Sequence, residues 1–271
     1  MSIVASDVLS RGALGASHET MPATRLAGIV FDVPDVFYDA TLWRRWLFQL
    51  LVRMRTLCDY AEFHTRWERH LSDVHCGRRE FGEALQTFLL DYGLSWAQID
   101  EIEAASRIQR QALEVDVRPL PGVVSMIRTL NQLRVPLVAW ADVPLTSAKL
   151  AERLERILPR AAFRAVVTSF EVECTQPDEQ CYKIMREAVA ASAGSMLYVG
   201  HDPAHLAAAS QAGLLTAALS YLPAGQIDFA LPRLEVLAEI ASSRWQANER
   251  QAGGGGQSPG ELSASSPGDY R

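Results

Sequence analysis

Short apolar runs that end at polar turns recur along the chain. The first covers residues 26–33 (LAGIVFDV) and stops at Asp32, Pro34 and Asp35, a pattern typical of a buried strand followed by a turn. Later runs of the same kind cover residues 136–140, 165–169, 196–200 and 214–219. Amphipathic patterns separate them over residues 122–133, 146–157, 178–192 and 203–212, and a last one starts at Pro232. This alternation predicts a doubly wound α/β fold, in which helices cover both faces of a parallel sheet.

The segment between the first two strands has a helical period throughout. Leu42, Trp46, Leu50 and Met54 recur every fourth residue, which places them on one helix face. The aromatic residues with this period are expected to form the core of an all-helical cap: Trp43, Trp46, Phe63, Trp67, Phe81 and Phe88. The predicted domains are this cap at residues 36–118 and an α/β core at residues 25–35 and 119–245.

Both ends of the chain differ in composition from its middle. Residues 1–24 show no sustained periodicity, and residues 246–271 are rich in Gly, Ser and Pro. Such segments bury too little apolar area to offset the chain entropy that folding removes. We therefore expect both ends to be disordered.

Composition and charge narrow the classes of partner. The 271 residues are 48% hydrophobic and 21% charged, the balance of an ordinary globular protein. Lys and Arg number 26 against 32 Asp and Glu, and the net charge of −6 argues against a nucleic-acid partner. No run reaches the roughly 18 apolar residues of a membrane span, and the first residues lack the apolar stretch of a signal peptide. We expect a cytoplasmic protein that binds neither nucleic acid nor membrane.

The cysteines and the insert histidines show no metal-binding spacing. Cys58, Cys76, Cys174 and Cys181 form no C-x-x-C pair, so free thiols are expected. Surface or packing roles are expected for His64, His70, His75 and Cys76.

Four turns carry the candidate chemistry. Ligands of parallel sheets bind where the strands end at their carboxyl side. The turns predicted at that edge begin at Asp32, Ala141, Gln176 and His201. These residues are therefore the candidate functional site.

Motifs at these turns resemble those of the haloacid dehalogenase superfamily, whose members are mostly phosphatases. The matching pieces are GIVFD at 28–32, PLPGV at 119–123, QPD at 176–178 and YVGHDPAHLAAASQAGLLTAAL at 198–219, with a helical insert directly after the first. The resemblance covers residues 27–240 and implies a Rossmann-type core with a helical cap of the C1 type. It also implies hydrolysis of a phosphoric monoester, although fold alone does not carry function.

The first motif of the family is only partly present. The resemblance implies that Asp32 is the nucleophile, since a carboxylate at a strand tip can form an aspartyl-phosphate. The family's general acid lies two residues further on, where this chain has Pro34, and Asp35 is one residue late. Protonation of a poor leaving group is therefore lost. Dehalogenase-like chemistry, which some family members carry out without this acid, stays open.

The second and third motifs have lost their polar groups. Ala141 stands where the family has a Ser or Thr that holds the phosphoryl group, with Asp142 following it. Gln176 stands where the family has a Lys that balances the negative charge. We expect these three residues to line the substrate side of the site in degenerate form.

Other cations are candidates for the missing charge. Lys183 lies roughly two helical turns from the strand tips, and Lys149 belongs to a different helix. Arg44 or Arg45 of the cap would supply the charge across the cleft.

The fourth motif holds Mg²⁺ in the family but has changed here. His201 replaces its first acidic residue and His205 lies near its second, with Asp202 between them. A weak Mg²⁺ site would use Asp32, Asp202 and the Pro34 carbonyl. One alternative is a transition-metal site of Asp32, His201 and His205, which is the ligand set of a facial triad. Another is that the histidines donate to an anion at the start of the following helix, and a third is that they have no special role.

Two functions follow from these departures. The first is a protein that has lost efficient phosphoryl transfer and acts by binding a small anionic metabolite or a protein partner. The second is an active hydrolase of the phosphatase or dehalogenase type, with Asp32 as nucleophile and an altered metal and charge site. We favour the first, because only one of the family's charged catalytic positions is retained and each preorganised group is worth about 10²–10³ in rate.

Overall fold

The chain folds around one parallel sheet. The structure is a computed structural model that describes residues 26–56, 59–158, 163–189, 196–219 and 227–243. Its strands are β1 (Gly28–Asp32), β2 (Leu137–Ala141), β3 (Phe163–Thr168), β4 (Met196–Gly200), β5 (Leu215–Leu219) and β6 (Phe229–Leu231). They are ordered β3-β2-β1-β4-β5-β6, and every neighbouring pair is parallel. The predicted doubly wound α/β fold is confirmed.

The central strands are buried on both faces. Every residue of β1 (GIVFD), β2 (LVAWA) and β4 (MLYVG) is buried. Strands covered on both faces have continuous apolar runs instead of alternating ones, which explains why these segments stood out in the sequence. From β1 the chain adds β2 and β3 on one side of the sheet and then β4, β5 and β6 on the other side. β1 therefore lies at the switch point where ligands of such sheets bind.

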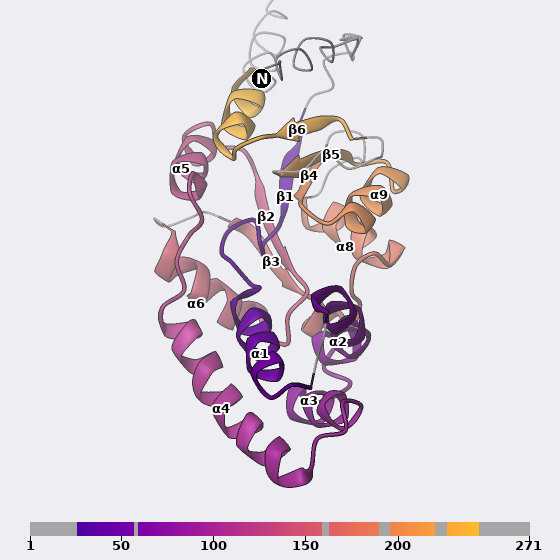
Figure 1. Ribbon diagram of the computed structural model, residues 1–271. Helices are drawn as coiled ribbons and strands as arrows, with labels where there is room; N and C mark the ends of the chain where they lie inside the picture. The colour runs from indigo at the N-terminus through magenta and orange to yellow at the C-terminus, as the bar shows by residue number, and fades with distance from the viewer. Residues whose placement is uncertain (1–25, 57–58, 159–162, 190–195, 220–226, 244–271) are drawn as a thin grey trace, which may run out of the picture.

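Helices cover the two faces separately. In Figure 1, α5 (Val123–Gln132) and α6 (Ser147–Ile157) lie on one side of the sheet, and α8 (Glu179–Val189) and α9 (Pro203–Gln211) lie on the other. Two buried apolar clusters correspond to these layers. Met126 and Leu150 belong to the first cluster, and Met185 and Leu206 belong to the second.

Four helices follow β1 and form the cap. They are α1 (Leu42–Arg53), α2 (Tyr60–His75), α3 (Phe81–Leu90) and α4 (Trp96–Val115), and Figure 1 shows them together at one end of the sheet. Their apolar residues form a third cluster. Trp43, Phe63, Trp67 and Phe88 are buried in it, and Trp46 and Phe81 pack against it. The expected aromatic core of the cap is confirmed.

Specific polar contacts fix the cap helices. Ser95 and Gln98 form a capping box at the start of α4, which satisfies backbone N–H groups that a helix start leaves unpaired. The indole of Trp43 donates to the buried hydroxyl of Ser106 at 3.0 Å, which ties α1 to α4.

Polar groups also join the cap to the core. The hydroxyls of Ser72 and Thr175 lie 3.0 Å apart, and the Arg78 guanidinium donates to the Glu173 carbonyl at 2.8 Å. Both contacts link the end of α2 to the segment after α7 (Ser169–Val172). The end of α2 is therefore one place where the cap is positioned over the sheet.

The structure differs from the sequence expectations in short elements and at boundaries. Neither β6 nor α7 was expected, because three or four residues are too few to show a period. The last helix covers described residues 235–243 and starts later than Pro232. The expected disordered ends at residues 1–24 and 246–271 lie outside the described residues. No helix among the described residues is long and apolar enough to span a membrane.

Candidate functional site

The Asp32 carboxylate lies at the end of β1 and has two neighbours on one oxygen. Its side chain is 5% exposed. The hydroxyl of Tyr198, on β4, donates to Oδ2 at 3.2 Å, and Nδ1 of His205, in the first turn of α9, lies 3.2 Å from the same oxygen. Because β4 pairs directly with β1, the sheet itself brings Tyr198 to Asp32.

The contact with Asp32 controls the charge of His205. Burial disfavours the charged imidazole, but the hydrogen bond to Asp32 and the charge of Asp32 outweigh it and raise the pKa of His205. The imidazolium is therefore favoured, and it forms an ion pair with Asp32.

Asp142 lies at the end of the neighbouring strand and is held by two donors. The backbone N–H of Gln176 donates to its Oδ2 at 2.9 Å, and the indole of Trp140 donates to its Oδ1 at 3.1 Å. Burial, followed by the negative charge of Asp32, raises the pKa of Asp142 to about 7. Ala141, the residue before it, packs in the apolar cluster under α5 and α6.

The side chain of Gln176 completes a chain of hydrogen bonds. Its Nε2 donates to the hydroxyl of Tyr198 at 2.6 Å and lies 3.5 Å from the hydroxyl of Tyr182. The hydroxyl of Tyr198 donates to Asp32, and the hydroxyl of Tyr182 donates to the carbonyl of His205 at 2.9 Å. Both hydroxyls already donate elsewhere, so the amide must present its N–H groups to them. Oε1 of Gln176 is buried and accepts from none of the described residues.

These side chains form one group, which we call the strand-end cluster: Asp32, Asp142, Gln176, Tyr182, Tyr198 and His205. The sequence singled out four of the six. It missed Tyr182 and Tyr198, because Tyr198 lies inside an apolar strand and Tyr182 lies on the buried face of an amphipathic helix, where both are expected to be core residues. The available signal for Tyr198 was a hydroxyl-bearing residue two positions before the end of a buried strand.

His201 lies beside Asp35. Its Nε2 is 3.7 Å from Oδ2 of Asp35, the same distance as a guanidinium nitrogen of Arg44. Asp35 has a positive φ of 60° and accepts from the backbone N–H of Ala40 at 2.7 Å. Burial raises the pKa of Asp35. Asp35 therefore stabilises its own turn and forms ion pairs with His201 and Arg44.

Asp202 is a helix cap. Its Oδ1 accepts from the backbone N–H groups of Ala204 at 2.7 Å and His205 at 3.2 Å, at the start of α9. These are the groups that an anion at this helix start would use. The expected anion site there is therefore taken by a side chain of the protein.

The candidate replacement cations pair with other carboxylates. The pairs are Arg44 with Glu68 and Asp35, Arg45 with Asp39, and Lys183 with Glu179. Their charge is therefore used away from Asp32.

A family model for haloacid dehalogenase-like hydrolases matches residues 26–213. The chain belongs to this family. The resemblance inferred from its motifs is thus confirmed at the level of the superfamily. The search of curated proteins found no match to this chain.

Solved structures show the same fold at low identity. A defluorinating L-2-haloacid dehalogenase is 17% identical, with a TM-score of 0.57, and the match covers 81% of this chain and 97% of that one. A β-phosphoglucomutase-like protein from Thermotoga maritima is 14% identical, with a TM-score of 0.57 and coverage of 80% and 98%. A hydrolase of the family from Bacillus subtilis, bound to magnesium, is 18% identical, with a TM-score of 0.54 and coverage of 80% and 98%. These likenesses support the fold only.

The donor set of this haloacid dehalogenase-like chain does not fit the expected metals. In the part of the chain that the structure describes, no group of three or more His, Cys, Asp or Glu could hold a metal ion. Asp32 and His205 contact each other, and His201 lies beside Asp35. Asp202 is turned into the start of α9. The transition-metal set of Asp32, His201 and His205 is therefore not assembled. In the Mg²⁺ set of Asp32, Asp202 and the Pro34 carbonyl, both carboxylates already accept hydrogen bonds from groups of the protein.

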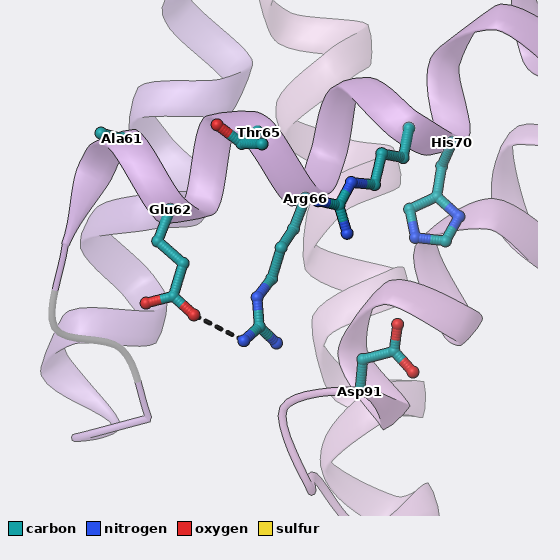
Figure 2. A pocket seen from close by; sticks show the side chains of 7 residues that line it. Ala61, Glu62, Thr65, Arg66, His70 and Asp91 are labelled. Atoms are coloured by element: carbon teal, nitrogen blue, oxygen red, sulfur yellow. Dashed lines mark ion pairs between the residues drawn. The ribbon is translucent and has the colours of Figure 1, made fainter.

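A hollow lies on the cap, apart from the strand-end cluster. Figure 2 shows it between α2 and the end of α3, with a volume of about 520 Å³. Its lining residues are Ala61, Glu62, Thr65, Arg66, Arg69, His70 and Asp91. Arg66 pairs with Glu62 at 2.5 Å, and burial together with the charge of Arg79 lowers the pKa of His70. Two guanidinium groups face two carboxylates here, so the hollow has no net preference for an anion.

Proposed function

We propose that this chain keeps the fold of its hydrolase family as a binding protein and does not carry out magnesium-dependent phosphoryl transfer. The observation that carries the proposal is the 3.2 Å contact between Nδ1 of His205 and Oδ2 of Asp32. It places an imidazole of the protein against the carboxylate that would otherwise coordinate a metal and attack phosphorus.

The charge balance of the strand-end cluster supports this proposal. Phosphoryl transfer needs positively charged groups beside the transferring phosphoryl group. His205 directs its charge at Asp32, and Gln176 is neutral. Each such loss costs about 10²–10³ in rate in comparable sites, so several together would remove efficient turnover.

The hydrogen-bond inventory indicates the ligand class better than the charge does. The sequence favoured a small anionic metabolite or a protein partner. Within the strand-end cluster, however, the buried group without a partner is an acceptor, since Oε1 of Gln176 has no donor among the described residues. A ligand group that presents an N–H or O–H bond would satisfy it, whereas a phosphate would add more acceptors. A hydroxyl- or amine-bearing ligand is therefore our first candidate.

Hydrolysis of p-nitrophenyl phosphate with Mg²⁺ tests the loss of catalysis. We expect the wild-type protein and Asp32→Asn both to remain at background, and Mg²⁺ to leave the melting temperature unchanged. Turnover in the wild type that Asp32→Asn abolishes would refute the proposal.

Thermal unfolding with ethanolamine, inositol and inorganic phosphate tests the ligand class. We expect one of the first two to raise the melting temperature of the wild type more than that of Gln176→Leu, with no shift from phosphate. A shift from phosphate alone would support the anionic ligand instead.

Metal-free displacement by Asp32 is the second candidate, favoured by Asp142. A carboxyl group with a pKa of about 7 beside a candidate nucleophile is typical of acid–base chemistry at neutral pH. A halide leaves without a proton, so Pro34 would be no obstacle to displacement at carbon. Halide release from 2-chloropropionate in the presence of EDTA would support this function if Asp32→Asn abolished it. Absence of release in the wild type would exclude it for this substrate.

A further inference from the structure

Two thiols face each other beside the strand-end cluster. Sγ of Cys174 lies 2.9 Å from Sγ of Cys181. Cys174 follows α7 and is half-buried, whereas Cys181 lies in the first turn of α8 and is buried. A disulfide bond is about 2.04 Å long, so little movement separates the two sulfur atoms from bonding.

We propose that Cys174 and Cys181 are a redox modification site, at which a peroxide forms an intramolecular disulfide and a dithiol reverses it. The inference is independent of the proposed function, because it concerns thiols that neither phosphoryl transfer nor ligand binding uses.

The chemistry has two balanced steps. Cys174 loses its proton, its thiolate attacks one oxygen of hydrogen peroxide, and the O–O bond breaks. The released hydroxide takes up that proton, so that Cys174 sulfenic acid and water form. Sγ of Cys181 then attacks Sγ of Cys174, and the S–O bond breaks with release of a second water. Two thiols are oxidised by two electrons, and the peroxide is reduced by the same two.

The surroundings select this pair of thiols. Cys174 is the more exposed of the two and therefore meets the oxidant first. Cys76 is also close to Cys174, since the charge of Cys174 is among the causes that raise the pKa of Cys76, but no contact between these two sulfur atoms is present in the described residues. Cys58 lies outside the described residues. Cys181 is thus the partner in contact.

Both thiols are protonated at neutral pH. Burial raises the pKa of Cys174, the carboxylates of Asp178 and Asp142 add to this, and Arg78 acts against it. Burial also raises the pKa of Cys181, with contributions from Cys174 and the same two carboxylates. Only the thiolate reacts, so oxidation is expected to be slow near pH 7 and faster at higher pH.

The disulfide would constrain the segment that holds Gln176. Residues 174–181 would become a closed ring, and Gln176 within it donates to Asp142 and to Tyr198. Oxidation is also expected to raise the melting temperature, because the disulfide bond restricts the unfolded chain.

Thiol counting and peptide mapping on the full chain test the proposal. After treatment with hydrogen peroxide, we expect two of the four thiols to be lost, a mass decrease of about 2 Da from the two hydrogens removed, and a bond mapped to Cys174 and Cys181. Dithiothreitol should restore all four thiols. Cys76→Ser should still form the bond, whereas Cys174→Ser and Cys181→Ala should not.

Three results would overturn the proposal. The bond could map to another pair, oxidation could stop at Cys174 sulfinic acid without a crosslink, or all four thiols could persist in the native wild type under conditions that oxidise the urea-unfolded chain. The mapping is done on the wild type, so it remains decisive even if far-UV circular dichroism shows a variant to be unfolded.

Discussion

A Cβ atom at Gly77 would lie 2.7 Å from the aromatic ring of Phe170. Gly77 follows α2 in the cap with a φ of +68°, and Phe170 belongs to α7 of the core. The backbone of the cap thus approaches a core side chain at a position where the conformation also favours glycine.

Gly77→Ala should destabilise the protein for both reasons. The left-handed conformation costs roughly 1–2 kcal/mol for a residue with a Cβ, and the contact with Phe170 adds about 1–3 kcal/mol. Gly93→Ala is the matched control, because Gly93 has a φ of +73° but nothing within 4 Å of its Cβ position. Urea unfolding of the two variants checks this. Equal losses of stability would show that Phe170 moves away freely.

The position of the strand-end cluster could be predicted from the sequence, but its hydrogen bonds and ion pairs could not. Asp32 and Asp142 lie at the ends of buried strands, and Gln176 and His205 lie in the segments that follow β3 and β4. The carboxyl edge of a parallel sheet gathers such residues. Which group each of them contacts depends on side-chain directions. The sequence places His205 beside His201 as a pair, yet the two contact different carboxylates.

Residues with two plausible roles were the hardest to predict. Asp202 is an acidic residue in a metal-binding motif and equally a residue that suits a helix cap, and only the backbone geometry decides between them. Tyr198 combines a ring that suits the core with a hydroxyl that suits the site.

Trp43→Phe should destabilise the cap. It removes the donor to Ser106, whose buried hydroxyl then lacks its partner, at a cost of about 1–3 kcal/mol beyond the change in packing. Ser106→Ala should cost about the same, because it leaves the indole N–H unpaired. In the double variant the two losses should not add, since both groups are gone. Additive losses in urea unfolding would show that the bond contributes nothing.

Asp202→Ala should cost about 0.5–2 kcal/mol through loss of the α9 cap. Asp202→Asn keeps an acceptor oxygen and should remain near wild-type stability. Neither variant should change the response of the melting temperature to Mg²⁺. If Mg²⁺ stabilised the wild type and not Asp202→Asn, Asp202 would be a metal ligand and not only a cap.

Asp142 should make the protein less stable as pH rises. Its pKa of about 7 lies above the ordinary value of 3.8, so the folded state holds this proton more tightly than the unfolded state. Its contribution is fully present below pH 3.8 and is lost as the pH rises to about 7. The slope approaches about 1.4 kcal/mol per pH unit for one proton. The stability difference between wild type and Asp142→Asn should follow this slope in urea titrations between pH 4 and 8. A constant difference would mean that Asp142 is ionised throughout.

His205 should give a pH dependence of the same sign at higher pH. Its pKa is raised above 6.5 by Asp32, so its stabilising contribution is fully present below pH 6.5 and is lost as the pH rises through the folded-state value. A hydrogen bond to a charged group contributes about 1.5–3 kcal/mol, and His205→Gln should lose that amount near pH 6 and much less at pH 9.

The matched control for this prediction is His64→Gln, which removes an imidazole that is 44% exposed in the cap. It should change stability little at either pH. NMR of the His205 ring in wild type and Asp32→Asn gives the decisive measurement. The imidazole should stay protonated to a higher pH in the wild type, because only there does a carboxylate lie against Nδ1. Identical titration of His205 in the two proteins would show that the ion pair with Asp32 does not form. The main argument that Asp32 is no longer free to act as a nucleophile would then fail.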